Sequence, residues 1–139
     1  MINIAINNQV SDNEWLKKLI IAYSKVNKDF HIMCWNDEKK EISYLEHYGR
    51  KDTISWNNGT IFYGKINYEF VKFVTSFSPP GNIYGDNRMT PFFTIQIGED
   101  FWCEHYGTEI NIINIPLEIE KEVKEVIKLL ELITNVNRY

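Results

Sequence analysis

Residues 91–115 read PFFTIQIGEDFWCEHYGTEINIINI, and this stretch decides the fold. Apolar and polar residues alternate along most of it, which is typical of β-strands with one buried face. The turn residues divide it into three antiparallel strands, predicted over Phe92–Ile97, Phe101–Tyr106 and Ile110–Ile115. A Gly98-Glu99-Asp100 loop joins the first two strands, and a Gly107-Thr108 turn joins the last two, as in common hairpins.

The loop length determines which residues face each other across the first hairpin. It pairs Ile97 with Phe101, Ile95 with Cys103, and Phe93 with His105. Because successive side chains point to opposite sides of a strand, the meander has two distinct faces. The first face is predicted to carry Phe93, Ile95, Ile97, Phe101, Cys103 and His105. The second face is predicted to carry Phe92, Thr94, Gln96, Trp102, Glu104 and Tyr106.

The same segment accounts for the net charge of the chain. Between Met89 and Ile115 there is no Lys or Arg, and the acids are Glu99, Asp100, Glu104 and Glu109. The other 15 acids are matched by 15 Lys and Arg residues, so the formal charge of −4 comes from this segment. An acidic chain without clustered Lys and Arg is poorly suited to nucleic acid, because phosphate contacts need cations. Its acids instead favour association with a basic protein.

Length and composition predict one domain. The chain has 139 residues, of which 44% are hydrophobic and 24% charged, values ordinary for a globular protein. Cys34 and Cys103 stand among apolar residues, as buried thiols in a reducing compartment do. The sequence shows neither a signal peptide nor an apolar run long enough to cross a membrane. We therefore expect a cytoplasmic protein with no membrane partner.

Helices and further strands are expected on both sides of the meander. Strands are predicted over Ile2–Ile6, Asp29–Trp35, Glu41–Tyr48, Thr53–Trp56 and Thr60–Ile66, and helices over Asp12–Asn27, Asn67–Phe77 and Pro116–Ile133. Ser11 is the expected N-cap of the first helix, with Glu14 completing a capping box. The residues of Asn67–Phe77 also fit a strand, so that alternative stays open. Ser78–Thr90 is rich in Pro, Gly and Asn and is expected to be a loop, and a second candidate contact surface.

Together these elements predict the α+β class. We expect one domain over residues 1–139, with an antiparallel sheet of about six or seven strands and two or three helices, including an N-terminal and a C-terminal helix. The C-terminal helix has the most regular pattern, and its apolar stripe consists of Ile119, Val123, Val126, Ile127, Leu130 and Ile133. We expect this helix to close the core.

Histidine and cysteine occur as His31-x-x-Cys34 and Cys103-x-His105, which are residue types found at zinc sites. Residues three apart on a strand face opposite ways, so His31 and Cys34 cannot easily share a ligand cluster. The spacing does not fit a zinc centre. We therefore expect neither a metal nor a cofactor.

A small hydrolase or nuclease is an alternative interpretation of the polar residues. It would use His47 or His105 as base, Glu46 or Glu104 as the neighbouring acid, and Arg50 or Lys51 to hold an anion. Adjacent residues on a strand point to opposite faces, so neither Glu–His neighbour pair is a ready dyad. The sequence has no phosphate loop, nucleophile elbow or paired-carboxylate motif, and we expect no enzymatic activity. A third interpretation is a small-molecule-binding domain, with Trp and Phe lining a cavity under the sheet.

Acidic and aromatic residues together are typical of a protein-binding surface, because Trp and Tyr are favoured anchors. The same aromatics could instead pack beneath a helix. The expected contact residues are Glu99, Asp100, Trp102, Glu104, Tyr106 and Glu109 of the meander, with Tyr84 and Asp86 of the preceding loop.

In its size and composition over the whole length, this small, acidic, aromatic-rich chain resembles the immunity proteins of bacterial contact-dependent toxin systems. Many of those proteins block nuclease toxins, which are basic because their substrates are anionic. The resemblance implies a non-enzymatic inhibitor that binds a basic toxin domain and covers its active site.

Overall fold

A computed structural model describes residues 1–52, 57–83 and 85–139. The protein is α+β, with an antiparallel eight-stranded sheet of order β10-β1-β9-β8-β7-β2-β4-β3. The sheet strands are β1 (Ile2–Ala5), β2 (Asp29–Trp35), β3 (Arg50–Lys51), β4 (Gly59–Lys65), β7 (Thr94–Ile97), β8 (Phe101–Glu104), β9 (Glu109–Ile112) and β10 (Asn135–Arg138). The described helices are α1 (Glu14–Lys25), α2 (Lys39–Leu45), α3 (Tyr68–Val74) and α4 (Glu120–Glu131), with 3₁₀ turns η1 (His105–Gly107) and η2 (Leu117–Ile119). The predicted fold class is confirmed, with more strands and helices than expected.

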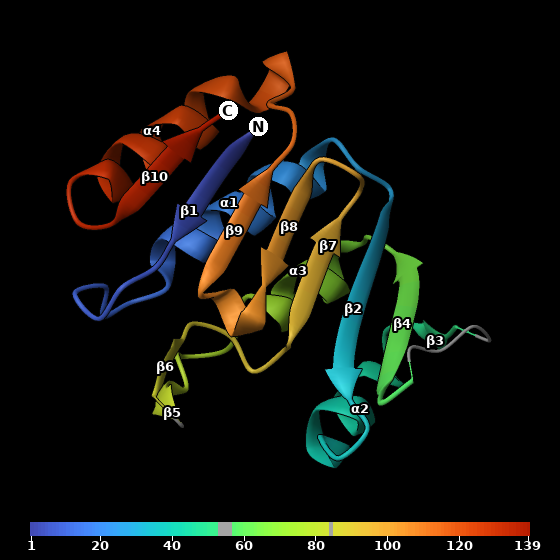
Figure 1. Ribbon diagram of the computed structural model, residues 1–139. Coiled ribbons are helices and arrows are strands. Elements are labelled where there is room, and N and C mark those ends of the chain that lie inside the picture. Colours follow the sequence, from blue (N-terminus) through green and yellow to red (C-terminus); the bar gives the residue numbers. More distant parts are fainter. Residues whose placement is uncertain (53–56, 84) are drawn as a thin grey trace.

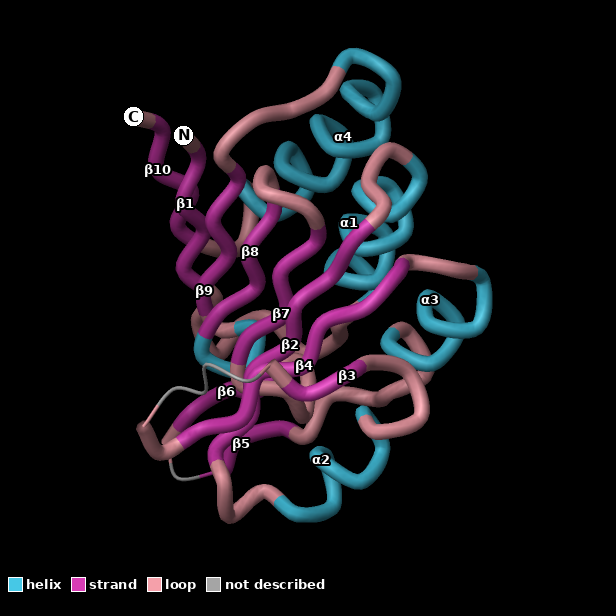
Figure 2. Tube along the Cα trace, turned by 90° about the vertical axis from the view of Figure 1, so that its right-hand side faces the viewer, coloured by secondary structure: helices cyan, strands magenta, loops and turns pink. Residues whose placement is uncertain are grey.

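The sheet has one covered and one uncovered face (Figures 1 and 2). Helices α1, α3 and α4 lie against the same face, and α2 lies at the end where β2 finishes. No described helix lies over the opposite face. A two-stranded ribbon of β5 (Gly81–Ile83) and β6 (Asp86–Arg88) lies beyond the turn that joins β8 to β9. We call the two sides of the sheet the covered face and the uncovered face.

The meander supplies the centre of the covered face. Its register pairs Ile97 with Phe101 and Ile95 with Cys103, as the loop length predicts. All four side chains have 0% exposure. Tyr23 of α1 stacks on Phe101, with 5.1 Å between the ring centroids. Large aromatic side chains contribute most to core burial, so this contact fastens α1 to the sheet.

The predicted third pair, Phe93 with His105, is wrong because β8 ends before His105. His105 and Tyr106 have φ angles of 50° and 60°, and Gly107 follows at 82°. Three successive residues in the left-handed region reverse the chain. The Tyr106 N–H then donates to the Phe93 carbonyl at 3.0 Å. As a result His105 is exposed and Tyr106 is buried, the opposite of the predicted faces.

Two strand ends of the meander also differ from the prediction. The first strand begins at Thr94 rather than at Phe92, and the third runs over Glu109–Ile112 rather than to Ile115. Phe92, predicted on the second face, is fully buried because its ring contacts Phe77 at 5.4 Å between centroids. It therefore packs beside the segment after α3 and does not lie on the uncovered face.

The predicted strand Glu41–Tyr48 is wrong, because most of this segment belongs to α2. Ile42 and Leu45 lie three residues apart, which places them on one side of a helix. Leu45 is fully buried in the core. Over so few residues the same apolar positions fit both a helix and a strand, and tertiary packing decides between them.

The C-terminal helix is confirmed, but α4 runs over Glu120–Glu131 and not over Pro116–Ile133, and the turn η2 precedes it. The chain then forms β10, which the sequence analysis did not predict. Its residues, NVNR, have little strand character except for Val136, which pairs with Ile4 of β1. This strand is stabilised by its neighbour and not by local propensity.

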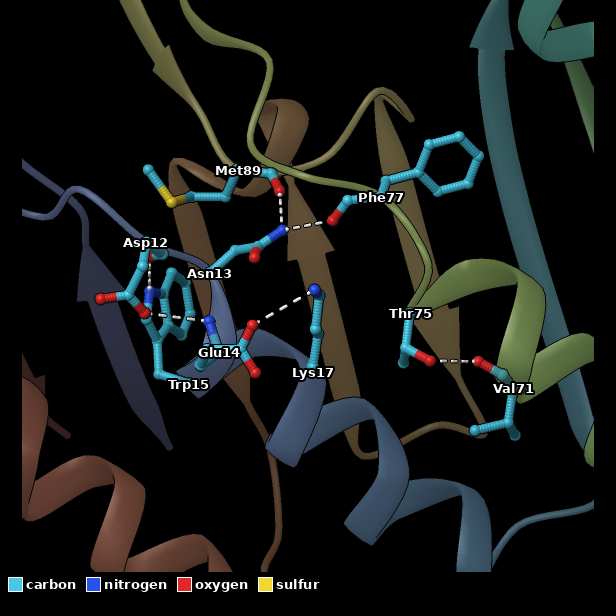
Figure 3. Close-up of polar contacts among 9 residues, drawn as sticks. All are labelled: Asp12, Asn13, Glu14, Trp15, Lys17, Val71, Thr75, Phe77 and Met89. Carbon is cyan, nitrogen blue, oxygen red and sulfur yellow. Dashed lines mark hydrogen bonds and ion pairs between the residues drawn. The ribbon is translucent and has the colours of Figure 1, made fainter.

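The first helix is confirmed, but its predicted capping box is wrong (Figure 3). Helix α1 begins at Glu14, whose N–H donates to Asp12 Oδ1 at 3.0 Å. The side chain of Asn13 donates to the carbonyls of Phe77 and Met89, both at 2.9 Å. Because Asn13 is buried, these two bonds tie the start of α1 to the segments after α3 and β6.

The open choice for residues 67–77 is settled as a helix. Asn67 caps α3 by accepting a hydrogen bond from the Phe70 N–H at 2.8 Å. The expected loop Ser78–Thr90 contains β5 and β6 instead of lacking secondary structure. The predicted strand Thr53–Trp56 and the candidate residue Tyr84 lie outside the described residues.

Candidate functional site

A row of polar and aromatic side chains crosses the uncovered face from one edge of the sheet to the other. In order of strand pairing, the row consists of Asn137, Asn3, Asn111, Trp102, Gln96, His31, Tyr63 and Arg50. The six inner positions, from Asn3 to Tyr63, alternate with buried apolar residues on their own strands, whereas the edge strands β10 and β3 have no buried residue. None of the eight is fully buried. The row therefore does not serve core packing, and Trp102 lies near its centre.

The four meander acids fall into two pairs, one at each end of β8. Glu99 and Asp100 lie in the loop before the strand, and Glu104 is its last residue. Glu104 lies directly opposite Glu109 of β9. A strand of four residues spans roughly 10 Å, so Trp102 lies between two acidic groups.

The Glu104–Glu109 pair places two carboxylates opposite each other on neighbouring strands. Like charges in this position destabilise a sheet. Neutral amides hold the pair together: the Asn111 side chain donates to Glu104 Oε2 and, at 3.4 Å, to Glu109 Oε1. The Asn3 side chain donates to Glu109 Oε1 at 3.0 Å. Amide donors satisfy the oxygens but leave both negative charges uncompensated.

Cations from elsewhere in the chain do not neutralise these acids. Within residues 1–52, 57–83 and 85–139, no Lys or Arg forms an ion pair with any of the four. His105 Nδ1 lies 3.3 Å from Glu109 Oε2 and bears a charge only when protonated. Asp100 lies near the covered face, since its charge adds to burial in raising the pKa of Tyr23. Of the four meander acids, Glu104 and Glu109 project from the uncovered face beside Trp102 and Asn111.

A polar cleft of about 580 Å³ lies beside the η1 turn, where β2 ends. It is lined by Trp35, Asn36, Asp37, Glu38, Glu41, Asn58, Arg88 and Tyr106. The Tyr106 hydroxyl donates to Glu38 Oε2 at 2.9 Å, and Glu38 Oε1 accepts the Trp35 N–H at 2.8 Å. The Arg88 guanidinium lies 3.6 Å from the centre of the Tyr106 ring. These contacts fix Glu38 and Tyr106 as rigid walls of the cleft.

Negative charge dominates the cleft. Burial raises the pKa of Glu41, and the charge of Glu38 raises it further. Burial also raises the pKa of the Tyr106 hydroxyl, followed by its hydrogen bond to Glu38. Burial opposes charge of either sign, whereas the contributions of Glu38 oppose added negative charge. Because the acids of the lining outnumber its one arginine, a basic side chain suits the cleft better than an acidic one.

Aromatic rings connect the cleft to the Glu104–Glu109 pair. Phe93 is the central ring, with centroid distances of 5.1 Å to Trp35, 5.6 Å to His105 and 5.3 Å to Tyr106. His105 in turn contacts Glu109. We define the acidic surface as this continuous region, formed by Trp35, Glu38, Glu41, Trp102, Glu104, His105, Tyr106 and Glu109.

The expected contact residues are therefore only partly brought together. Trp102, Glu104, Glu109 and Tyr106 belong to the acidic surface, whereas Glu99 and Asp100 lie at the other end of β8. Asp86 lies near the cleft, with Oδ2 at 3.9 Å from an Arg88 nitrogen. The sequence analysis missed Glu38, Glu41 and Arg88. Their local sequence gave no signal, because Glu38 and Arg88 contact Tyr106 from distant parts of the chain, and Glu41 lines the same cleft from α2.

The residues of the hydrolase alternative are separated into two groups. Glu46, His47 and Arg50 line another cleft, also of about 580 Å³, beside Tyr63 and Lys65. In contrast, Glu104 and His105 belong to the acidic surface. Glu46 lies 3.9 Å from Lys51, and both side chains are largely exposed. Among the described residues, no hydrogen bond joins Glu46 to His47.

Residues that could bind a metal are dispersed. His31 lies on the uncovered face, whereas Cys34 is fully buried on the covered face. Within the described ranges, no group of three or more His, Cys, Asp and Glu residues could hold a metal ion. None of the described helices has the length and apolar character needed to cross a bilayer.

Comparison of the chain with protein-family models, curated proteins and solved structures found no match. The function must therefore be argued from the geometry and charge of the surface itself.

Proposed function

We propose that this protein is a cytoplasmic, non-enzymatic inhibitor of the immunity-protein type. It binds a basic, nuclease-type toxin domain through the acidic surface and covers the active site of that toxin. The observation that supports this most is the Glu104–Glu109 pair, whose two carboxylates face each other and receive amide donors but no Lys or Arg from the described chain.

The cost of this pair is the first argument for a basic partner. Cross-strand like charges lower stability by some tenths of a kcal/mol, up to about 1 kcal/mol. A Lys or Arg of a partner placed between the two carboxylates would remove this repulsion and gain charge-assisted hydrogen bonds. Binding would thus be strengthened because it removes a charge repulsion that is present in the free protein.

Trp102 provides the apolar part of the same contact. It is half-buried on the uncovered face and its indole N–H donates to the Glu99 carbonyl at 3.3 Å. Interfaces gain most of their affinity from a few aromatic anchors surrounded by polar contacts. Trp102 beside Glu104 fits that arrangement.

The cleft extends the contact with a site for one basic side chain. Glu38 is held in place by Trp35 and Tyr106, so its carboxylate is ordered before a partner arrives. Preorganisation lowers the entropic cost of binding. If a catalytic Lys or Arg of the toxin enters this cleft, the toxin can no longer use that side chain to bind its nucleic acid.

The test uses the product of the neighbouring upstream gene, expressed as the candidate toxin. We expect a stoichiometric complex with the full chain, loss of the toxin's nuclease activity in that complex, and association that slows markedly as salt is added. Failure to form a complex contradicts the proposal. A complex that leaves the nuclease fully active contradicts the proposed mode of inhibition.

A second candidate function, a small hydrolase or nuclease, is favoured by the convergence of Glu46, His47 and Arg50 on one cleft. It predicts hydrolysis of nucleic acid or ester substrates by the purified chain. The activity would be lost in His47→Ala and retained in the control His105→Ala. Equal, background-level rates for all three proteins would remove this candidate.

A further inference from the structure

Helices α1 and α4 lie side by side and run in opposite directions (Figure 1). Their outer surface is partly apolar. A groove of about 300 Å³ lies between them. Ile21 of α1 and Leu129 of α4 line it with 40% and 52% exposure, and Leu132 just beyond α4 is 80% exposed. Exposed apolar side chains that are scattered singly are ordinary, whereas a group of them indicates a contact surface.

The two sides of the groove carry opposite charges. Lys18 and Lys25 line it from α1, and Glu122 and Glu125 line it from α4. Neighbouring residues on the same helices do form ion pairs, for example Lys17 with Glu14 at 3.3 Å. Among the described residues, none of the four groove charges is in an ion pair.

We propose that this groove is the interface of a homodimer. The charges that line the groove are basic on α1 and acidic on α4, so this lining is complementary to a second copy of itself. In a two-fold dimer the same patch is used twice, so each lysine contact occurs twice as well. The apolar side chains Ile21 and Leu129 would be buried between the copies.

The charges also select the direction of the two-fold axis. If the axis runs parallel to the groove, each α1 lies on the α4 of the other copy, and Lys18 and Lys25 meet Glu122 and Glu125. If the axis lies across the groove, α1 meets α1 and lysines face lysines. Like charges at an interface cost several kcal/mol, so the first arrangement is the one that forms.

The expected dimer is small and reversible. Each helix has 12 residues and is therefore about 18 Å long, and two helices are about 20 Å wide. The flat footprint is roughly 360 Å² per copy, or about 720 Å² in total, which is less than the roughly 1,200 Å² of a stable specific interface, so the dimer is a weak, transient one. Helices α1 and α4 lie on the covered face (Figure 2), whereas Trp102, Glu104 and Glu109 project from the uncovered face, so a dimer leaves these residues of both copies open to partners.

The first test is sedimentation equilibrium of the full chain from low to high micromolar concentration at low salt. We expect a monomer–dimer equilibrium whose dissociation constant rises at least tenfold in Leu129→Glu. The matched control is Leu117→Glu, which changes an 81% exposed leucine outside the groove and is expected to dimerise like wild type. A wild-type chain that stays monomeric at all concentrations, or a dimer unaffected by Leu129→Glu, overturns the proposal.

The second test examines the arrangement itself with two charge variants. Lys18→Glu/Lys25→Glu makes both sides of the groove acidic, and Glu122→Lys/Glu125→Lys makes both sides basic. Each variant alone is expected to be monomeric, whereas an equimolar mixture is expected to form a heterodimer. If the axis lay across the groove, like charges would already face each other in wild type, so a variant that alone dimerises as well as wild type overturns the proposed axis. A mixture that stays monomeric while wild type dimerises overturns the proposed role of the groove charges.

Discussion

Phe101 and Trp102 are neighbours in β8, yet they lie in opposite environments. Phe101 projects from the covered face, is fully buried and stacks on Tyr23 of α1. Trp102 projects from the uncovered face, is only half-buried and lies in the row of polar side chains. The covered face is determined by the need to exclude water, which restricts its positions to well-packed apolar residues.

The uncovered face is under no such restriction, and this difference supports the proposal that the docking site lies there. Nothing in core packing requires an acid at Glu104 opposite another at Glu109, and the pair lowers stability. Residues that lower stability without a packing role are best explained by binding. The two faces should therefore respond in opposite ways to substitution.

The largest expected contrast comes from alanine at the two neighbouring positions. Phe101→Ala removes a buried ring and should lower the free energy of unfolding by about 3–5 kcal/mol. Trp102→Ala should lower it by less, about 1–2 kcal/mol, because part of its side chain is solvated and its removal leaves no enclosed cavity. Urea unfolding followed by circular dichroism measures both. Similar losses in the two variants would show that Trp102 is a core residue.

Gly64 offers a smaller test on the covered face. A Cβ at this position would lie 2.9 Å from both Phe30 Cε1 and the Tyr48 carbonyl oxygen. Because Phe30 is fully buried and stacks on Phe70 at 3.8 Å, it has little room to move. Gly64→Ala should therefore lower the free energy of unfolding by about 1–3 kcal/mol.

The control for Gly64 is its exposed neighbour. Lys65→Ala removes a surface ion pair with Asp29 and should change stability by less than about 1 kcal/mol. If Gly64→Ala is as mild as Lys65→Ala, the backbone and Phe30 are less tightly packed than described.

On the uncovered face we expect a substitution to increase stability. Glu104→Gln keeps the shape of the side chain and removes one of two facing charges. The free energy of unfolding should therefore rise by about 0.2–1 kcal/mol. The gain should shrink as salt is added, since screening already weakens the repulsion. Glu118→Gln, at an exposed position before α4, is the control and should show no gain. A loss of stability in Glu104→Gln would mean that the carboxylate is needed for folding.

Glu41 should give the smallest effect, and it depends on pH. Burial and the charge of Glu38 raise the pKa of Glu41 in the folded protein. Ionisation of this carboxyl is therefore less favourable in the folded state than in the unfolded state. The resulting loss of stability is absent at low pH and develops as the pH rises through the ordinary Glu range near 4.3 and above. Glu41→Gln should match wild type in acid and be more stable at neutral pH by some tenths of a kcal/mol. Denaturant unfolding at two pH values measures this, and equal stabilities at both would contradict it.

The covered face was largely predictable from the sequence, because its signals are local. Alternation and a three-residue loop were enough to predict the pairing of Ile97 with Phe101 and of Ile95 with Cys103. The stripe of α4 and the Asn67 cap of α3 are also local signals. Each of these features depends on residues within a few positions of one another.

The features that the sequence analysis missed depend on contacts distant in the chain. β10 is stabilised by pairing with β1, and α2 is decided by the burial of Leu45. The positive φ angles of His105 and Tyr106 end β8 early and redirect Tyr106 toward Glu38. The cleft could not be predicted because Glu38 and Tyr106 are 68 positions apart.

The most direct test of the proposed docking site is the dissociation constant of the complex with the neighbouring gene product, measured by isothermal titration calorimetry. Glu104→Lys/Glu109→Lys should weaken binding at least 100-fold, about 3 kcal/mol, because two attractive contacts become repulsive. Glu69→Lys/Glu118→Lys makes the same change in net charge at exposed positions away from the acidic surface and should stay within a few-fold of wild type. Equal weakening by both pairs, or by neither, would contradict the assignment of the acidic surface as the docking site.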